Sequence, residues 1–150
     1  MSEQDNRRIT EESLEAINAH DPDRYLKYLD DSYIWENDAF PAPIRGPEGA
    51  RQVLAAYFAA IPDVRFEIEQ VITSGDHVVV CSRMTGTHKG EFRGPGALGL
   101  PPTNQQFSIH SCSVTEMRKG RAVKTITYGD RLAMLQQLGV LPLVKSAVTG

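Results

Sequence analysis

Strand patterns fill the second half of the chain, and this feature most constrains the fold. Val64, Phe66 and Ile68 alternate with charged residues, which is the period of a strand with one buried face. Turns at residues 74–76 and 118–120 then separate long apolar runs. The expected strands run from residue 64 to the first turn, and over residues 77–88, 103–117 and 122–129. We expect them to form one mainly antiparallel sheet.

The first 62 residues instead carry helical periodicity. Apolar residues recur at helical spacing over residues 6–18. The run Asp21-Pro22-Asp23 combines an N-cap, a proline at the first helical position and an acid in the first turn. A third helix begins at Gly46-Pro47-Glu48 and ends at Pro62. Three helices therefore precede the sheet.

Residues 32–37 interrupt the helices with aromatic and β-branched residues, which favour a strand. On that strand Tyr33, Trp35 and Asn37 share one face. A short helix over residues 131–138 closes the pattern. The order of elements predicts the α+β class, with a curved sheet over three N-terminal helices.

Size and charge exclude several classes of protein. A chain of 150 residues predicts a single domain, residues 1–150, that buries its own core. Against 19 acidic residues the chain has 16 Lys and Arg, a formal net charge of −3, so we expect no nucleic-acid partner. No apolar run is long enough to span a membrane, and the polar start does not resemble a signal peptide. We expect a soluble, cytoplasmic protein.

Cysteine and histidine give no metal motif. Cys81 and Cys112 form no C-x-x-C pair, which predicts buried, reduced thiols. The histidines are scattered, so we expect no metal, although strands could bring His88 and His110 together. Residues 94–99 have the spacing G-x-G-x-x-G, but prolines follow where a phosphate-binding helix would begin.

Residues 90–102 are rich in glycine, and glycine-rich segments order poorly unless a ligand or partner holds them. We therefore expect these residues to form a mobile lid or rim at a pocket mouth.

Asp130 stands where the last strand pattern passes directly into the last helical pattern. A carboxylate at that place can point into an apolar hollow, where desolvation suits it to move protons. It can equally be an N-cap, which accepts hydrogen bonds from the first amides of the helix. The residue pattern leaves both interpretations open.

Five short motifs occur in an order that resembles the SnoaL-like polyketide cyclases, a branch of the nuclear-transport-factor-like superfamily. They are RGPEG at residues 45–49, IPDVRFE at 61–67, GTHKGEF at 86–92, PPT at 101–103, and residues 120–130. The resemblance covers nearly the whole chain and implies a cone-shaped α+β barrel with an internal pocket. Ile126 and Asn104 stand where family members commonly carry tryptophan and glycine.

The resemblance also implies a chemistry. Such cyclases close a ring by intramolecular aldol condensation of a polycyclic aromatic ester, without metal or cofactor. An aspartate at the end of the last strand is their general acid/base, and Asp130 occupies that position here. An isomerase, dehydratase or epoxide hydrolase of the same fold is an alternative, and so is a non-catalytic binding or dimerisation module.

Other residues are candidates for the pocket. His110 projects to the face opposite Phe107 and Ile109, and if that face is concave it can bind a substrate carbonyl or orient Asp130. On a convex face it instead belongs to a subunit contact. His88 ends a strand near the glycine-rich segment. For a hydrophobic small-molecule substrate, we expect the binding residues to be Trp35, Asn37, Tyr57, Phe58, His88 and Tyr128.

One strand has apolar residues on both faces. Val79 and Cys81 alternate with Val78 and Val80, so the helices of one domain cannot cover both sides. We therefore expect a homodimer.

Overall fold

A computed structural model describes residues 1–95 and 99–141 of the protein. Within them lie four helices and one sheet of six strands, which confirms the expected α+β class. The helices are α1 (Glu3–Asn18), α2 (Pro22–Leu26), α3 (Gly46–Ala60) and α4 (Arg131–Gln137). The strands are β1 (Leu29–Asn37), β2 (Ile44–Arg45), β3 (Arg65–Ser74), β4 (His77–Thr87), β5 (Gln106–Arg118) and β6 (Arg121–Gly129). Residues 96–98, which belong both to the G-x-G-x-x-G spacing and to the expected lid, lie outside the described residues.

Local chemistry sets the ends of the N-terminal helices. Ser2 and Asp5 form a reciprocal capping box, so α1 begins earlier than its apolar periodicity predicts. The Asp21 carboxylate accepts a hydrogen bond from the amide of Arg24 and caps α2, as expected. Helix α3 ends at Ala60, shortly before Pro62.

The strands follow the order β2-β1-β6-β5-β4-β3. Neighbours run antiparallel except β1 and β6, which are parallel, so the expectation of a mainly antiparallel sheet is confirmed. Strand β2 was not expected, because two residues are too short to show a period. A bulge between Ile68 and Gln70 shifts the register of β3 and reverses its alternation.

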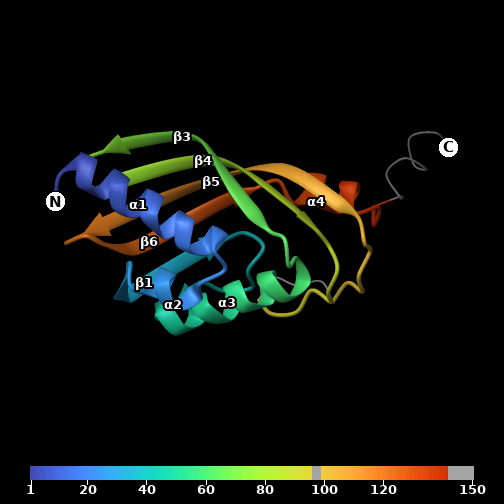
Figure 1. The fold of residues 1–150 in the computed structure, drawn as a ribbon. Helices are drawn as coiled ribbons and strands as arrows, with labels where there is room; N and C mark the ends of the chain where they lie inside the picture. Colours follow the sequence, from blue (N-terminus) through green and yellow to red (C-terminus); the bar gives the residue numbers. More distant parts are fainter. Residues whose placement is uncertain (96–98, 142–150) are drawn as a thin grey trace.

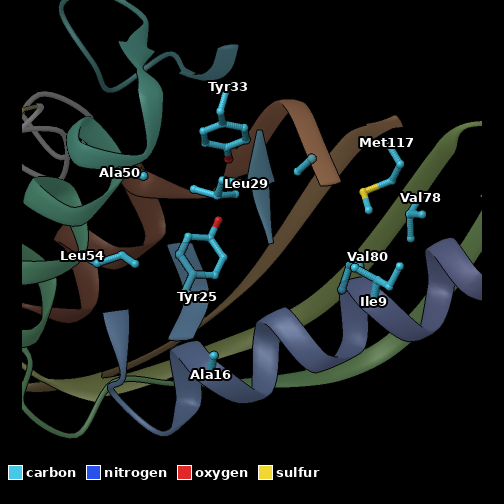
Figure 2. Packing of buried hydrophobic residues seen from close by; sticks show 11 residues of the cluster. Ile9, Ala16, Tyr25, Leu29, Tyr33, Ala50, Leu54, Val78, Val80 and Met117 are labelled. Atoms are coloured by element: carbon cyan, nitrogen blue, oxygen red, sulfur yellow. The ribbon is translucent and has the colours of Figure 1, made fainter. Parts of the chain in front are cut away.

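The sheet curves over helices α1, α2 and α3, which lie on its concave side, while α4 lies at the far end beside β5 (Figure 1). Two clusters of buried side chains hold these layers together. The first joins α1, α2 and α3 to β1 and β4, around Tyr25, Tyr33 and Leu54 (Figure 2). The second joins the end of α3 to α4 and includes Phe92 and Met134. This is the cone-shaped arrangement that the sequence predicted.

The two cysteines correct one expectation. They are partly exposed rather than buried, and they pair directly across strands β4 and β5, Cys81 opposite Cys112. Burial, together with the neighbouring Cys81 thiol, raises the pKa of Cys112. The sequence did not indicate this pairing, because the two cysteines are 31 residues apart and become neighbours only through the register of β4 and β5.

Candidate active site

A cavity of about 160 Å³ lies between the two clusters, enclosed by the helices and the concave face of the sheet. Most of its wall is apolar, with Leu54, Phe58, Val80 and Ile109 among the lining residues. This is the usual form of a small-molecule site, an apolar hollow with a limited set of polar groups.

The polar groups come mainly from alternate strand residues. Every second residue of a strand faces the cavity, and many of these residues carry a hydroxyl group. This hydroxyl series consists of Ser82 on β4, Ser111, Ser113 and Thr115 on β5, and Thr125 and Thr127 on β6. The Thr115 and Thr125 hydroxyls lie 3.0 Å apart, and Trp35 Nε1 donates to Thr127 Oγ1 at 2.9 Å.

Two tyrosines, Tyr25 of α2 and Tyr33 of β1, line the deep part of the cavity and point their hydroxyls toward one another (Figure 2). Only 1% of Tyr33 is exposed, and its hydroxyl has no hydrogen bond of normal geometry to any described residue. Burial, reinforced by the neighbouring Tyr25, raises the pKa of Tyr33 well above its usual value. Both phenols are therefore neutral hydrogen-bond donors at physiological pH.

The opposite end of the cavity opens into an outer groove. Cavity and groove share seven lining residues, so they are continuous: Asn37, Ala39, Ser82, Ser111, Thr127, Gly129 and Arg131. Among the described residues that line the cavity, Arg131 carries the only charge. Burial raises the pKa of Tyr57, and the Arg131 guanidinium acts in the other direction. The mouth of the cavity therefore holds one guanidinium, with the carboxylates of Asp38 and Asp130 near it in the groove.

Asp130 lies in the outer groove at this mouth. It is exposed, and its Oδ1 accepts a hydrogen bond of 2.9 Å from the amide of Ala133, so it caps α4. The residues on either side of it, Gly129 and Arg131, line the cavity itself. The carboxylate is therefore one residue away from the wall of the cavity, on the solvent side of its mouth.

His110 also lines the groove, on the outer face of the sheet. Ser111 pairs with Gly129, so continuing this register places His110 opposite Asp130. The imidazole is 72% exposed, and its Nε2 lies 2.8 Å from Arg83 and 3.4 Å from a Glu69 oxygen. Of the two placements considered from the sequence, the structure has the convex one.

His88 lines neither the cavity nor the groove. It is fully buried at the end of β4, where Nδ1 accepts a hydrogen bond from the amide of Thr103 and lies 3.1 Å from that residue's hydroxyl. This contact ties the two ends of the segment that follows β4 together. Phe92, within that segment, packs edge-on against Tyr57 with ring centroids 5.2 Å apart.

The structure divides the predicted site residues into three groups, of which His88, buried away from cavity and groove, forms one by itself. Trp35, Asn37, Tyr57 and Phe58 line the cavity, and Tyr33 shares that face with Trp35 and Asn37, as the alternation predicted. Tyr128, His110 and Asp130 line the outer groove instead, where Tyr128 is 56% exposed. Their roles in binding and catalysis stay predictions.

Sequence reasoning missed the hydroxyl series, Tyr25 and Arg131. A signal for the hydroxyls was present, because Ser111, Ser113 and Thr115 recur with period two on the face that also carries Phe107 and Ile109. Small polar residues on a face that should be buried indicate a lined cavity rather than a packed core. No comparable signal marked Arg131, whose side chain reaches the cavity from the first turn of α4.

Comparison with known proteins gives the family. A family model described as SnoaL-like polyketide cyclase matches residues 7–138. The chain belongs to the SnoaL-like polyketide cyclase family. No protein with a curated description matches the sequence.

Solved structures share the fold. AclR from Streptomyces galilaeus, described as a candidate hydroxylase, is 22% identical, with 94% of this chain and 89% of that chain covered and a TM-score of 0.80. A candidate SnoaL-like polyketide cyclase from Jannaschia sp. CCS1 is 21% identical, with coverages of 93% and 94% and a TM-score of 0.82. IdmH from Streptomyces antibioticus, a candidate polyketide cyclase, is 26% identical, with coverages of 90% and 99% and a TM-score of 0.75.

The described residues contain neither a membrane-spanning helix nor a cluster of metal ligands. None of their helices has the length and apolar character that crossing a membrane requires. Among residues 1–95 and 99–141, no three His, Cys, Asp or Glu side chains gather in a group suited to a metal ion.

Proposed function

We propose that the protein is a polyketide-cyclase-type enzyme that closes a ring in a planar aromatic ester by proton transfer through Asp130. The continuity of the cavity with the groove that holds Asp130 carries this proposal. A flat molecule seated in the cavity extends its outer end through the mouth, past Gly129 and Arg131. Its enolisable carbon then lies beside the Asp130 carboxylate.

The residues suit an intramolecular aldol condensation. Asp130 takes a proton from a carbon flanked by carbonyl groups, so a C–H bond breaks and an enolate forms. The Arg131 guanidinium at the mouth favours the negative charge that develops there. The enolate carbon then attacks a second carbonyl carbon of the same molecule, and Asp130 returns the proton to the new alkoxide. The sequence of steps is redox-neutral.

A second function, a non-catalytic binding module, is favoured by one observation. Asp130 is exposed and already engaged as the N-cap of α4, and no described residue lining the cavity is a carboxylate or a histidine. In this function the cavity holds its ligand while Asp130 only stabilises the helix.

Exchange of a carbon-bound proton separates the two functions without the natural substrate. The probe is 2-tetralone, a bicyclic aromatic ketone whose C1 hydrogens exchange with deuterium and are followed by NMR. We expect the wild-type protein to accelerate the exchange and Asp130→Asn to lower this acceleration about a hundredfold or more. The asparagine keeps an oxygen that can cap α4, so stability should change by less than about 1 kcal/mol.

Asp21→Asn is the matched control, because Asp21 is also an N-cap and lines neither cavity nor groove. It should leave the acceleration unchanged. Full acceleration in folded Asp130→Asn protein would exclude Asp130 as the base. A wild-type protein that binds 2-tetralone without accelerating its exchange would support the binding module.

A further inference from the structure

The deep end of the cavity contains a buried hydroxyl without a well-formed hydrogen bond. The Tyr33 hydroxyl is enclosed by Tyr25 and by the inner part of the cavity, and although the side chains of Tyr25 and Thr125 lie near enough to affect its pKa, it makes no hydrogen bond of normal geometry to any described residue. Leaving a buried polar group without a partner destabilises a protein, so such groups are uncommon unless a water or ligand completes them. Figure 2 shows this hydroxyl turned toward that of Tyr25.

The surroundings of this hydroxyl are polar as well. A second, smaller cavity of about 30 Å³ shares five residues with the large one, and four of them carry aliphatic hydroxyls: Thr10, Ser13, Thr115 and Thr125, together with Tyr25. The middle of the large cavity, by contrast, has Leu54, Phe58 and Val80 in its wall. The cavity thus has hydroxyls at its inner end, large apolar side chains beside further hydroxyls in its middle, and the Arg131 guanidinium at its mouth.

We infer that the deep end is a hydrogen-bonding subsite in which Tyr33, with Tyr25 beside it, donates to a carbonyl or phenolic oxygen at the inner end of a planar aromatic ligand. The ligand is then oriented, with an anionic or enolisable group outward at Arg131. The inference rests on the planar aromatic substrate of the proposed function and adds to it a contact that orients the molecule, through an oxygen at the end opposite its acidic group. The binding itself does not require that Asp130 be catalytic.

The dimensions agree with such a ligand. Thr125, at the deep end, and Gly129, at the mouth, are four residues apart on β6, about 13 Å at a rise of ~3.3 Å per residue. A two-ring aromatic molecule with polar groups at both ends spans this length together with the Arg131 side chain. Its rings would lie beside Trp35 and Phe58.

Calorimetric titration with two probes tests the subsite. The first, 6-hydroxy-2-naphthoate, carries a hydroxyl and a carboxylate at opposite ends; the second, 2-naphthoate, lacks the hydroxyl. We expect the first to bind the wild-type protein about tenfold more tightly. Tyr33→Phe should abolish that preference and leave the Kd of 2-naphthoate within about twofold, because only the hydroxyl contact is lost.

Two further variants sharpen the result. Arg131→Gln should weaken both probes equally, since both place a carboxylate at the mouth. Thr85→Val is the control, because it removes a hydroxyl from a residue that lines neither the large cavity nor the smaller one, and it should keep the preference. Thermal unfolding of each variant shows that it is folded.

Three results would overturn the inference. Equal affinity of the wild-type protein for both probes would mean that the hydroxyl meets no donor. Equal weakening of both probes by Tyr33→Phe would assign Tyr33 a packing role. Absence of binding by either naphthoate would exclude the ligand class. None of these measurements depends on proton exchange, so failure of the subsite and failure of the proposed catalysis are distinguishable.

Discussion

The two faces of strand β5 differ sharply in chemistry although their residues alternate along one short segment of the chain. The face toward the helices carries Phe107 and Ile109 and then Ser111 and Ser113, which line the cavity. The outer face carries exposed polar residues, Ser108, His110 and Glu116, and two half-buried residues, Cys112 and Val114. The inner face therefore lines a cavity suited to a small molecule, whereas the outer face is a partly apolar surface.

The outer face of the sheet carries apolar residues suited to contact with another protein chain. On the outer face Ile72, Val79, Val114 and Ile126 follow one another across strands β3, β4, β5 and β6. We call these four residues the outer row. Its members are partly or largely exposed, and Ile72 is 47% exposed. A continuous apolar row on a sheet is typical of a face that another molecule covers, whereas the hydroxyl series on the inner face lines the cavity.

The largest expected effect tests whether the ligand binds in the cavity on the inner face. Ser113→Phe places a ring in the cavity, and we expect the Kd of 6-hydroxy-2-naphthoate to rise about a hundredfold or more, because a volume of about 160 Å³ cannot hold both. Val114→Phe is the matched control, one residue along on the outer face. Titration calorimetry measures both. Equal losses of affinity, or none in Ser113→Phe, would mean that the ligand lies elsewhere.

The outer face is tested by its predicted role in a homodimer. Val114→Lys introduces a charge at the centre of the outer row, and burying an unpaired charge opposes association. We expect sedimentation velocity to show the wild-type protein as a dimer at micromolar concentration and the variant with a dimer Kd raised about tenfold or more. The naphthoate Kd should not change. A monomeric wild-type protein would remove the homodimer prediction and leave the outer row without an explanation.

Alternation in the sequence sufficed to predict which residues share a face, but not which face is concave. It placed Tyr33, Trp35 and Asn37 together, and the structure has all three on the cavity wall. It also separated His110 from Ile109, yet gave no indication that His110 lies outside. Curvature depends on how helices pack against the whole sheet, and the bulge at β3 reverses the alternation within one strand.

The start of a helix was predicted correctly where a single residue determines it, as Asp21 does for α2. Asp130 shows the limit of this reasoning. Its place between strand and helix was clear from the sequence, and so was its capacity to cap. Its exposure at the mouth of the cavity depends on the path of α4, which is set by Met134 and Leu138 packing against β5 and Phe92, contacts between residues far apart in the chain.

The smallest expected effect concerns a hydrogen bond within the inner face. Thr127→Val keeps the β-branched shape but removes the oxygen that accepts from Trp35 Nε1 at 2.9 Å, so a partly buried donor loses its partner. We expect a loss of about 1 kcal/mol in the free energy of unfolding, measured by urea titration with the fluorescence of Trp35, the single tryptophan. Thr85→Val makes the same chemical change on the outer face of β4, where the hydroxyl has no hydrogen bond within the described part of the chain, and it should stay within about 0.5 kcal/mol of the wild type. If the two variants lose the same stability, the Trp35 contact adds nothing, and the inner face owes its order to packing alone.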